Sequence, residues 1–344
     1  MSEVIQNTIY VMTQGSYLYK EGETIAVSVE HITQAKIPMH LIQGVVGFGE
    51  VSMSPFLMHA LAERSIAVTF LSMTGRLLCR VDAPSSGNVL LRREQFRKAD
   101  LDLYINDVSR AVVAGKIQNS RTFVLRAARE MENPEIALEL RGVAKQLEEL
   151  LFSLSSAKAV DSIRGFEGKA AERYFSVFSH LIKQNKDDFF FKNRTRRPPL
   201  DPVNAMLSFG YALLLNDCVS ALTSVGLDPS VGFLHTDRPG RPALALDLME
   251  ELRALWIDRL VVKLINRREV SISGFTIREG GAVEMDDSTR KILIQSYQER
   301  KKEKLIHPLL NQEIAFGLLP FVQARLLARY LRGDLESYIP YLGT

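Results

Sequence analysis

Residues 14–29 read QGSYLYKEGETIAVSV, and this stretch decides the class of the first part of the chain. Two runs rich in aromatic and β-branched residues are separated by turn signals at Gly15 and Gly22. Such runs are typical of β-strands, and glycine is favoured where the chain reverses direction. The stretch therefore predicts paired strands.

Similar runs continue on both sides, from Asn7 to Val81. They are TIYVM (8–12), IPMHLIQGVVGFG (37–49), IAVTFL (66–71) and LLCRV (77–81). One helical stretch interrupts them at residues 54–65, SPFLMHALAERS, with Ser54 as the expected N-cap and Pro55 at the first helical position. We predict a β-rich domain over residues 1–87.

The pattern changes once. Residues 83–88, APSSGN, have the composition of a short linker, and the chain beyond them has helical periodicity almost to its end. A hairpin-like patch, VSISGFTIREGGAVEM, is expected near residues 270–285. The predicted architecture is α+β and multidomain, with a mostly α-helical domain over residues 88–344.

Composition restricts the class of protein. The chain has 344 residues, 46% hydrophobic and 24% charged, with a net charge of +3, which is typical of a globular protein with a sizeable core. Its first residues lack the pattern of a secretion signal, and the apolar run AMLSFGYALLL is shorter than a bilayer span. We expect a cytoplasmic protein with no membrane segment. The two cysteines, Cys79 and Cys218, show neither metal-binding spacing nor a disulfide framework.

The glycines of GVVGFG, residues 44–49, raise the question of a dinucleotide site. The fingerprint GxGxxG must open a helix inside a parallel βαβ unit, but Ser52 stands where the third glycine belongs. We expect consecutive antiparallel strands here, with the glycines in turns or bulges.

Residues 232–250, GFLHTDRPGRPALALDLME, place a histidine shortly before a helix with two acids one turn apart. On that helix, Leu244 and Leu248 belong to the apolar face, and Asp247 and Glu250 fall opposite it. The acids are then either solvated or ligands of a cation that His235 completes. A loop histidine is more often an ordinary hydrogen-bonding residue.

A third acid, Glu167, lies on the inward stripe of its own helix with Ala170, Tyr174 and Phe178. Burial of an unpaired carboxylate is costly, so such a residue is normally paired, protonated or bound to metal. Two alternatives stay open at this point: a salt bridge to Arg164 or another base, and a metal site.

Glu167, His235 and Glu250, with Asp247 beside them, would form a mixed carboxylate and imidazole site suited to Mg²⁺ or Mn²⁺. Such ions serve phosphoryl transfer. Basic residues in two loops fit a phosphodiester substrate, unless they are simply solvated. They are Lys192, Arg194, Arg196 and Arg197 in FKNRTRRPPLDPVN, and Arg238 and Arg241 after His235.

Long motifs across nearly the whole chain resemble one known family. RGFEGKAAERYFSVF, DPVNAMLSFGYALL, GLDPSVGFLHTDRPGRPALALDLMEELR and ARYLRGDLESYIPYL are similar to the CRISPR-associated adaptation integrase, the catalytic subunit that inserts spacers into a CRISPR array, in its type I-C branch. The resemblance implies an N-terminal β-sandwich-like dimerisation domain, a helical catalytic domain, a homodimer, and a small ferredoxin-like partner subunit.

The resemblance also implies roles for the acids and the histidine. Glu167, His235 and Glu250 match the family's metal ligands, and Asp247 matches a further acid needed for activity. Ala254 stands where many relatives have proline. The implied reaction is attack of a DNA 3′ hydroxyl on a phosphodiester at a repeat boundary, with nuclease activity on duplex and branched DNA when water attacks instead. Two alternatives are a stand-alone structure-selective repair nuclease and a non-catalytic DNA-binding scaffold.

Overall fold

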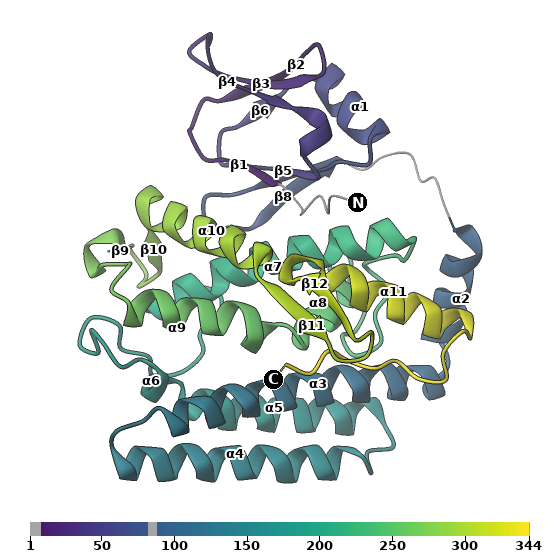
Figure 1. Cartoon of the computed structure of the whole chain (residues 1–344), viewed down its shortest axis with the longest axis vertical. Coiled ribbons are helices and arrows are strands. Elements are labelled where there is room, and N and C mark those ends of the chain that lie inside the picture. The colour runs from purple at the N-terminus through teal and green to yellow at the C-terminus, as the bar shows by residue number, and fades with distance from the viewer. Residues whose placement is uncertain (1–7, 82–87, 344) are drawn as a thin grey trace. The chain divides into compact units, whose positions relative to one another are not determined.

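The computed structural model describes residues 8–81 and 88–343, and the elements labelled in Figure 1 lie within these ranges. Strands predominate up to Val81 and helices predominate from Asn88 onward, which confirms the predicted α+β class. The predicted linker, residues 83–88, falls outside the described residues except for Asn88, which caps the first helix that follows.

The described chain divides into two compact units. One contains the residues up to Val81 together with Tyr297–Lys304 and Ala315–Leu318. The other contains Asn88–Ser296, Leu305–Ile314 and the residues from Leu319 onward. Each unit is therefore assembled from segments that are distant in the sequence.

Within residues 8–81 the first unit has two four-stranded sheets, with strand orders β1-β5-β7-β8 and β4-β3-β2-β6. The strands are β1 (Thr8–Val11), β2 (Tyr17–Glu21), β3 (Thr24–Val29), β4 (Ile32–Pro38), β5 (Gly44–Phe48), β6 (Ser52–Met53), β7 (Ala67–Leu71) and β8 (Leu77–Val81). The hairpin of β2 and β3 is the pair that residues 14–29 predict.

Strand direction around GVVGFG differs from the expectation. β5 pairs in parallel with both β1 and β7, so the prediction of consecutive antiparallel strands is wrong there. The crossovers that parallel pairing requires are supplied by β2, β3 and β4 on one side and by helix α1 (Pro55–Glu63) on the other. The glycine pair nevertheless does not open a helix, because β6 stands between it and α1.

One core holds this unit together. Leu18 and Ile25 from one sheet pack with Val45 and Val68 from the other, and Leu57 of α1 joins them. All five are at least 99% buried, and apolar area removed from water stabilises by roughly 25 cal/mol per Å². Helix α1 begins as predicted, because the Ser54 hydroxyl accepts a hydrogen bond of 3.2 Å from the Leu57 N–H.

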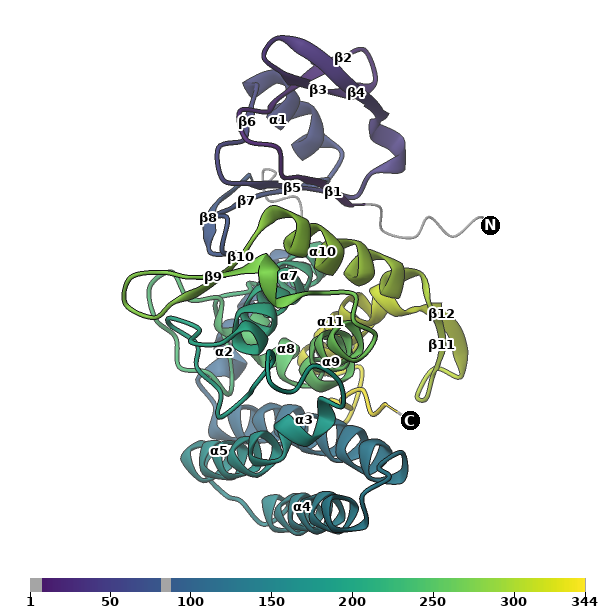
Figure 2. The ribbon, with the colours of Figure 1, turned by 90° about the vertical axis from the view of Figure 1, so that its left-hand side faces the viewer.

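The second unit is mostly helical, and the views in Figures 1 and 2 show α3, α4 and α5 side by side in it. Its helices are α2 (Val89–Ala99), α3 (Asp102–Arg129), α4 (Pro134–Leu154), α5 (Val160–Ser176), α6 (Phe178–Leu181), α7 (Pro202–Val225), α8 (Ala243–Glu250), α9 (Arg259–Asn266) and α11 (Leu319–Arg332), with the first part of α10 (Asp287–Lys302). The expected hairpin is present as β9 (Phe275–Ile277) and β10 (Val283–Met285), and β11 (Lys304–His307) pairs with β12 (Gln312–Ala315).

Helix α7 contains the apolar run and is longer than the run itself. Asp201 caps its start by accepting from the Asn204 N–H at 2.7 Å, and Gly226 ends it with a φ of 89°. By length and composition alone its 24 residues could cross a membrane, but 67% of its most apolar 18-residue window is buried inside the protein. This is the pattern of a core helix.

Candidate active site

Helix α8 carries Asp247 and Glu250, and both acids are buried. Asp247 is 1% exposed and Glu250 is 3% exposed, as buried as Leu244 and Leu248. The prediction that the two acids lie on an outer face is therefore wrong. The physical reason is that α3, α7 and α11 all pack on α8, so the side opposite its leucines also faces protein. Solvated acids are excluded at these two positions.

Asp247 organises the loop that precedes the helix. Its Oδ2 accepts the backbone N–H groups of Phe233 (2.7 Å) and Leu234 (3.0 Å), and its Oδ1 accepts the His235 N–H at 2.9 Å. The same Oδ1 lies 2.7 Å from His235 Nδ1, and as an acceptor it favours the tautomer with the imidazole proton on Nδ1. A Cβ on Gly232 would lie 2.8 Å from Ala243 Cβ, so only glycine allows this close approach of loop and helix.

This arrangement leaves Nε2 as the ring nitrogen of His235 that Asp247 does not contact. Nε2 lies 3.8 Å from Glu250 Oε1, and the histidine side chain is 21% exposed. Asp247 therefore acts on the site through His235, because its own oxygens already accept four hydrogen bonds within the loop.

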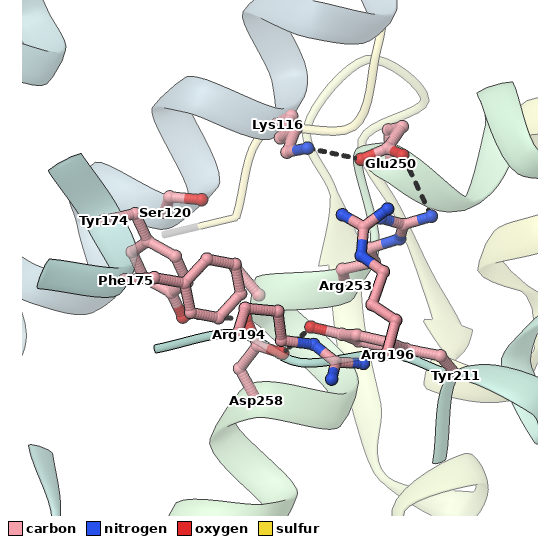
Figure 3. Close-up of a pocket in the computed structure, with 11 residues that line it drawn as sticks. Lys116, Ser120, Tyr174, Phe175, Arg194, Arg196, Tyr211, Glu250, Arg253 and Asp258 are labelled. Atoms are coloured by element: carbon pink, nitrogen blue, oxygen red, sulfur yellow. Dashed lines mark hydrogen bonds and ion pairs between the residues drawn. The ribbon is translucent and has the colours of Figure 1, made fainter. Parts of the chain in front are cut away.

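Glu250 is ionised although it is buried. Burial alone would raise its pKa, but the positive charges of Arg253 and Lys116 lower the pKa to about 2. Arg253 Nη2 lies 2.9 Å from Oε1, and Lys116 Nζ lies 2.7 Å from Oε2. Figure 3 shows the two cations meeting this carboxylate from different sides.

Glu167 on α5 faces the same lysine. Its side chain is 26% exposed, and its Oε1 forms a short ion pair with Lys116 Nζ. Arg164 is not its partner, because that guanidinium bonds Asp161 at 2.8 Å and the Leu234 carbonyl at 2.7 Å. Of the two alternatives that the sequence left open, a salt bridge is thus present, with a base other than Arg164.

The three predicted ligands come from three elements that meet around Lys116 and Glu250. Glu167 comes from α5, His235 from the loop after α7, and Glu250 from α8, and Lys116 of α3 lies between the two glutamates. Two carboxylates and an imidazole Nε2 are a donor set that suits Mg²⁺ or Mn²⁺. Across residues 8–81 and 88–343, no three His, Cys, Asp or Glu side chains lie close enough together to hold a metal ion. In this conformation an ammonium contacts the oxygens that would be shared.

Lys116 is a residue that sequence reasoning missed. It lies one turn from the buried residues Val112 and Ser120, on the same stripe of α3 as Asn119 and Phe123. Its neighbours on this stripe include the polar residues Asn119 and Ser120, so the sequence signal for a buried lysine is weaker here than the signal for Glu167.

A pocket beside Glu250 is walled by aromatic and basic side chains, as Figure 3 shows. Its empty space, including the part open to solvent, is about 350 Å³, and Lys116, Arg194, Arg196 and Arg253 line it. The guanidinium carbons of Arg194 and Arg253 lie 5.3 Å and 5.2 Å from the Tyr211 ring centroid, within cation–π range. The net positive lining suits an anion such as a phosphate.

Asp258 is a buried acid in the lining of this pocket. Tyr211 and Tyr174 donate hydrogen bonds of 2.6 Å and 2.7 Å to its two oxygens. Burial raises the pKa of Asp258 to about 6, in spite of the two hydroxyl donors. Asp258 ends a π-helical segment, Ala254–Asp258, and segments of this type are frequent at functional sites.

The predicted DNA-binding residues differ in exposure. Lys192, Arg196 and Arg197 are exposed. Arg194 is largely enclosed, donates to Asn204 Oδ1 at 2.7 Å and Ser208 Oγ at 3.0 Å, and has a pKa lowered by burial. Arg238 is exposed, and Arg241 is half-buried with a weak contact of 3.4 Å to the Thr236 carbonyl. Their contact with DNA stays a prediction, and for Arg194 the structure shows an internal role as well.

Comparison with known proteins gives one consistent family. The sequence model described as "CRISPR associated protein Cas1" matches residues 9–299. The chain is 48% identical over 336 residues to "CRISPR-associated endonuclease Cas1 1" of Chlorobaculum tepidum, covering 98% of each protein. It is 45% identical to "CRISPR-associated endonuclease Cas1 2" of Rhodospirillum rubrum, covering 97% of this chain and 98% of that one.

Solved structures agree in fold. A casposase bound to integration product superposes with a TM-score of 0.83 at 23% identity, over 97% of this chain and 93% of the other. A CAS1 protein from Thermotoga maritima gives 0.82 at 22% identity, over 98% and 99%. A chain of a Cas6-RT-Cas1–Cas2 complex gives 0.84 at 21% identity, over 100% of this chain and 37% of that one.

Proposed function

This chain belongs to the Cas1 family of CRISPR-associated proteins, and from that premise we propose that it is the catalytic subunit of a spacer-acquisition complex of the type I-C branch. Two relatives that share 45–48% of their residues with this chain are named endonucleases, which supports that class of activity. The observation that carries the finer proposal is that Glu167 and Glu250 share Lys116, and that His235 Nε2 lies 3.8 Å from Glu250 Oε1, beside a basic pocket.

The proposed cofactor is Mg²⁺ or Mn²⁺. Glu167, Glu250 and His235 Nε2 would hold it, and the buried, ionised state of Glu250 provides the negative charge that a dication requires. When bound, the ion supplies Lewis-acid polarisation of a phosphodiester oxygen and lowers the pKa of an attacking hydroxyl. Asp247 keeps the imidazole in the tautomer whose Nε2 can coordinate.

The proposed reaction is transesterification. The 3′ hydroxyl of a duplex fragment attacks a phosphorus atom at a repeat boundary, a new P–O bond forms to that oxygen, and the bond to the repeat strand breaks to release its own 3′ hydroxyl. Arg196 and Arg253 line the pocket where they can stabilise the negative charge on the phosphate oxygens. With water as the nucleophile, the same residues would cleave duplex or branched DNA.

Partners follow from the same premise. We propose double-stranded DNA, both fragment and repeat, a second copy of this chain as a homodimer, and a small ferredoxin-like CRISPR-associated subunit, in the cytoplasm. A solved relative in fold is part of a Cas6-RT-Cas1–Cas2 complex, which supports a CRISPR-associated partner.

The test is a joining assay. Purified protein, with and without its small partner, is incubated with a labelled 3′-hydroxyl duplex and a plasmid that carries a CRISPR repeat. We expect label in the plasmid at repeat boundaries, with either metal and not with EDTA. Glu167→Gln should abolish joining, and Glu172→Gln, on the exposed face of the same helix, is the matched control. Cleavage of branched DNA without any joining would support a stand-alone repair nuclease instead.

A further inference from the structure

We propose that Lys116 holds the two metal-binding carboxylates together until a divalent ion arrives, and that its ammonium then moves to a phosphate of the bound DNA. This inference rests on the proposed function, because it assumes a cation and a nucleic acid at this site. It makes Lys116 a positioning and phosphate-binding residue that links the two binding events.

The contacts define the first position of the lysine. Lys116 Nζ forms an ion pair with Glu167 and lies 2.7 Å from Glu250 Oε2, and its side chain is only 11% exposed. The same carboxylates are the donors that a dication would share, at about 2.0–2.2 Å. An ammonium and a dication repel each other at such separations, so an ion shared by Glu167 Oε1 and Glu250 Oε2 would displace the ammonium from these two oxygens.

Of the two cations beside Glu250, Lys116 is the one built to move. Arg253 is fixed, because its guanidinium bonds Glu250 at 2.9 Å and stacks 5.2 Å from the Tyr211 ring centroid. A lysine instead has a flexible four-carbon stem with a compact charge. Rotation of its side chain can carry Nζ away from the carboxylates without any movement of α3.

The pocket defines the second position. Lys116 lines it together with Ser120 of the next helical turn, and Arg194, Arg196 and Arg253 supply further positive charge. The pocket is open to solvent and lies directly beside Glu250, so it suits a phosphodiester next to the reacting centre. Nζ can therefore exchange a carboxylate for a phosphate within the reach of one side chain.

Charge balance gives the same order of events. Glu167 and Glu250 are matched by Lys116 and Arg253, so these four side chains are neutral together. A dication adds two positive charges, which favours the approach of phosphate. A phosphate in the pocket draws Lys116 away and frees the carboxylates for the ion. Metal and DNA should consequently bind with positive cooperativity.

The experiment is calorimetric titration of Mn²⁺ into the full-length protein, alone and with a duplex whose ends lack the 3′ hydroxyl so that no joining occurs. We expect Lys116→Gln to bind Mn²⁺ about tenfold more tightly than wild type without DNA, because the competing cation is gone. The ratio of the Mn²⁺ Kd without DNA to that with DNA should be smaller in Lys116→Gln than in wild type.

Two variants control for charge and folding. Arg121→Gln makes the same charge change on α3, where Arg121 pairs with Glu148 at 2.6 Å, and it should bind Mn²⁺ like wild type. Lys116→Arg keeps the charge between the glutamates and should bind Mn²⁺ no more tightly than wild type.

Weaker Mn²⁺ binding by Lys116→Gln, with thermal melting showing a folded protein, would overturn the proposal and make the lysine a permanent support of the ligands. Unchanged coupling to DNA would also overturn it. Glu250→Gln separates these results from failure of the proposed function: if this variant binds Mn²⁺ like wild type, the metal site itself is misplaced, whatever Lys116 does.

Discussion

Glu167 and Glu250 share one lysine, but they differ in burial and in which charged groups would lose a partner if each were removed. Glu250 is 97% buried between two cations, whereas Glu167 is a quarter exposed and meets one. Loss of Glu167 leaves Lys116 paired with Glu250. Loss of Glu250 removes the carboxylate that pairs with the buried Arg253, while Lys116 keeps Glu167, and loss of one partner from a buried ion pair is the costly kind of change.

Glu167→Ala should therefore keep the fold and lose the chemistry. We expect the free energy of unfolding to fall by about 1 kcal/mol or less, because a partly exposed ion pair contributes little. Metal-dependent cleavage and joining should fall at least about a hundredfold with the loss of a ligand. Urea unfolding beside a cleavage assay measures both. A folded variant with full activity would remove Glu167 from the site.

Substitutions of His235 and Asp247 should both abolish activity, but they should differ in their effect on stability. Asp247→Asn replaces a carboxylate that accepts four hydrogen bonds by an amide that can accept at its oxygen only. We therefore expect the free energy of unfolding to fall by about 2–4 kcal/mol, and activity to be lost as well. His235→Ala should lose activity with a much smaller stability change, since its side chain is 21% exposed. Equal stability of the two variants, measured by urea unfolding, would mean that Asp247 does not organise the loop.

At the scale of elements, the loop at 192–197 contains both exposed basic side chains and one, Arg194, that is largely enclosed. Replacement of Lys192 and Arg197 by alanine should weaken binding of all duplex sequences alike and reduce the log-log salt slope by about one per lost contact. Arg194→Ala should instead lower stability, because its bonds to Asn204 and Ser208 join this loop to α7. Fluorescence anisotropy at several salt concentrations gives the slopes. An unchanged slope in the double variant would show that these two residues are simply solvated.

Asp258 ties α5, α7 and the π-helical segment together, and its protonation predicts a dependence of stability on pH. Its pKa rises from 3.8 to about 6 on folding, so folding favours the protonated form. That contribution is complete below pH 3.8 and is lost as pH rises through about 6. Two pKa units correspond to about 3 kcal/mol.

Asp258→Asn cannot lose a proton, which makes it the natural comparison. Between pH 4 and pH 7, the unfolding free energy of wild type should fall by about 2 kcal/mol relative to this variant. Parallel pH profiles for the two proteins, in guanidinium unfolding at each pH, would show that Asp258 ionises in the fold as it does in water.

Many of the helices and strands could be predicted from the local sequence pattern alone. The hairpin at 14–29, the Ser54 cap and the short β9–β10 pair depend on nearby residues and were predictable from them. The direction of β5 was not, because parallel pairing is decided by distant strands. The burial of Asp247 could not be predicted from a helical projection for a similar reason. A projection separates the two faces of a helix, but it cannot show that other helices pack against both of them.

Sequence patterns pointed to three side chains of the candidate site, but not to how those side chains are arranged. An acid on an apolar stripe pointed to Glu167, and the resemblance of long motifs pointed to His235 and Glu250. Lys116 lies 51 residues before Glu167, and nothing local indicates that their helices meet. That pairing is a property of tertiary packing.

At the scale of the whole molecule, the N-terminal unit is completed by residues from near the end of the chain. Tyr297 is fully buried and Lys301 is 99% buried, and Gln298 donates a hydrogen bond of 2.8 Å to the Tyr10 hydroxyl. The Phe316 N–H bonds the Glu303 carbonyl at 2.7 Å. The change of sequence pattern near residue 87 predicts a domain boundary, and this unit also includes 297–304 and 315–318.

A fragment of residues 1–87 should consequently be less stable than the same residues in the full chain. Loss of one hydrogen bond with its buried neighbours costs at least about 1 kcal/mol, which speeds amide exchange in β5 and β7 by about fivefold where exchange requires opening of the whole unit. Hydrogen–deuterium exchange with mass spectrometry reads these strands separately. Addition of a peptide of residues 297–318 should slow the exchange again, and a peptide of the same composition in scrambled order should not. Equal exchange of β5 and β7 in fragment and full chain would mean that the strands and α1 form a core sufficient in itself, and that the C-terminal segments only cover it.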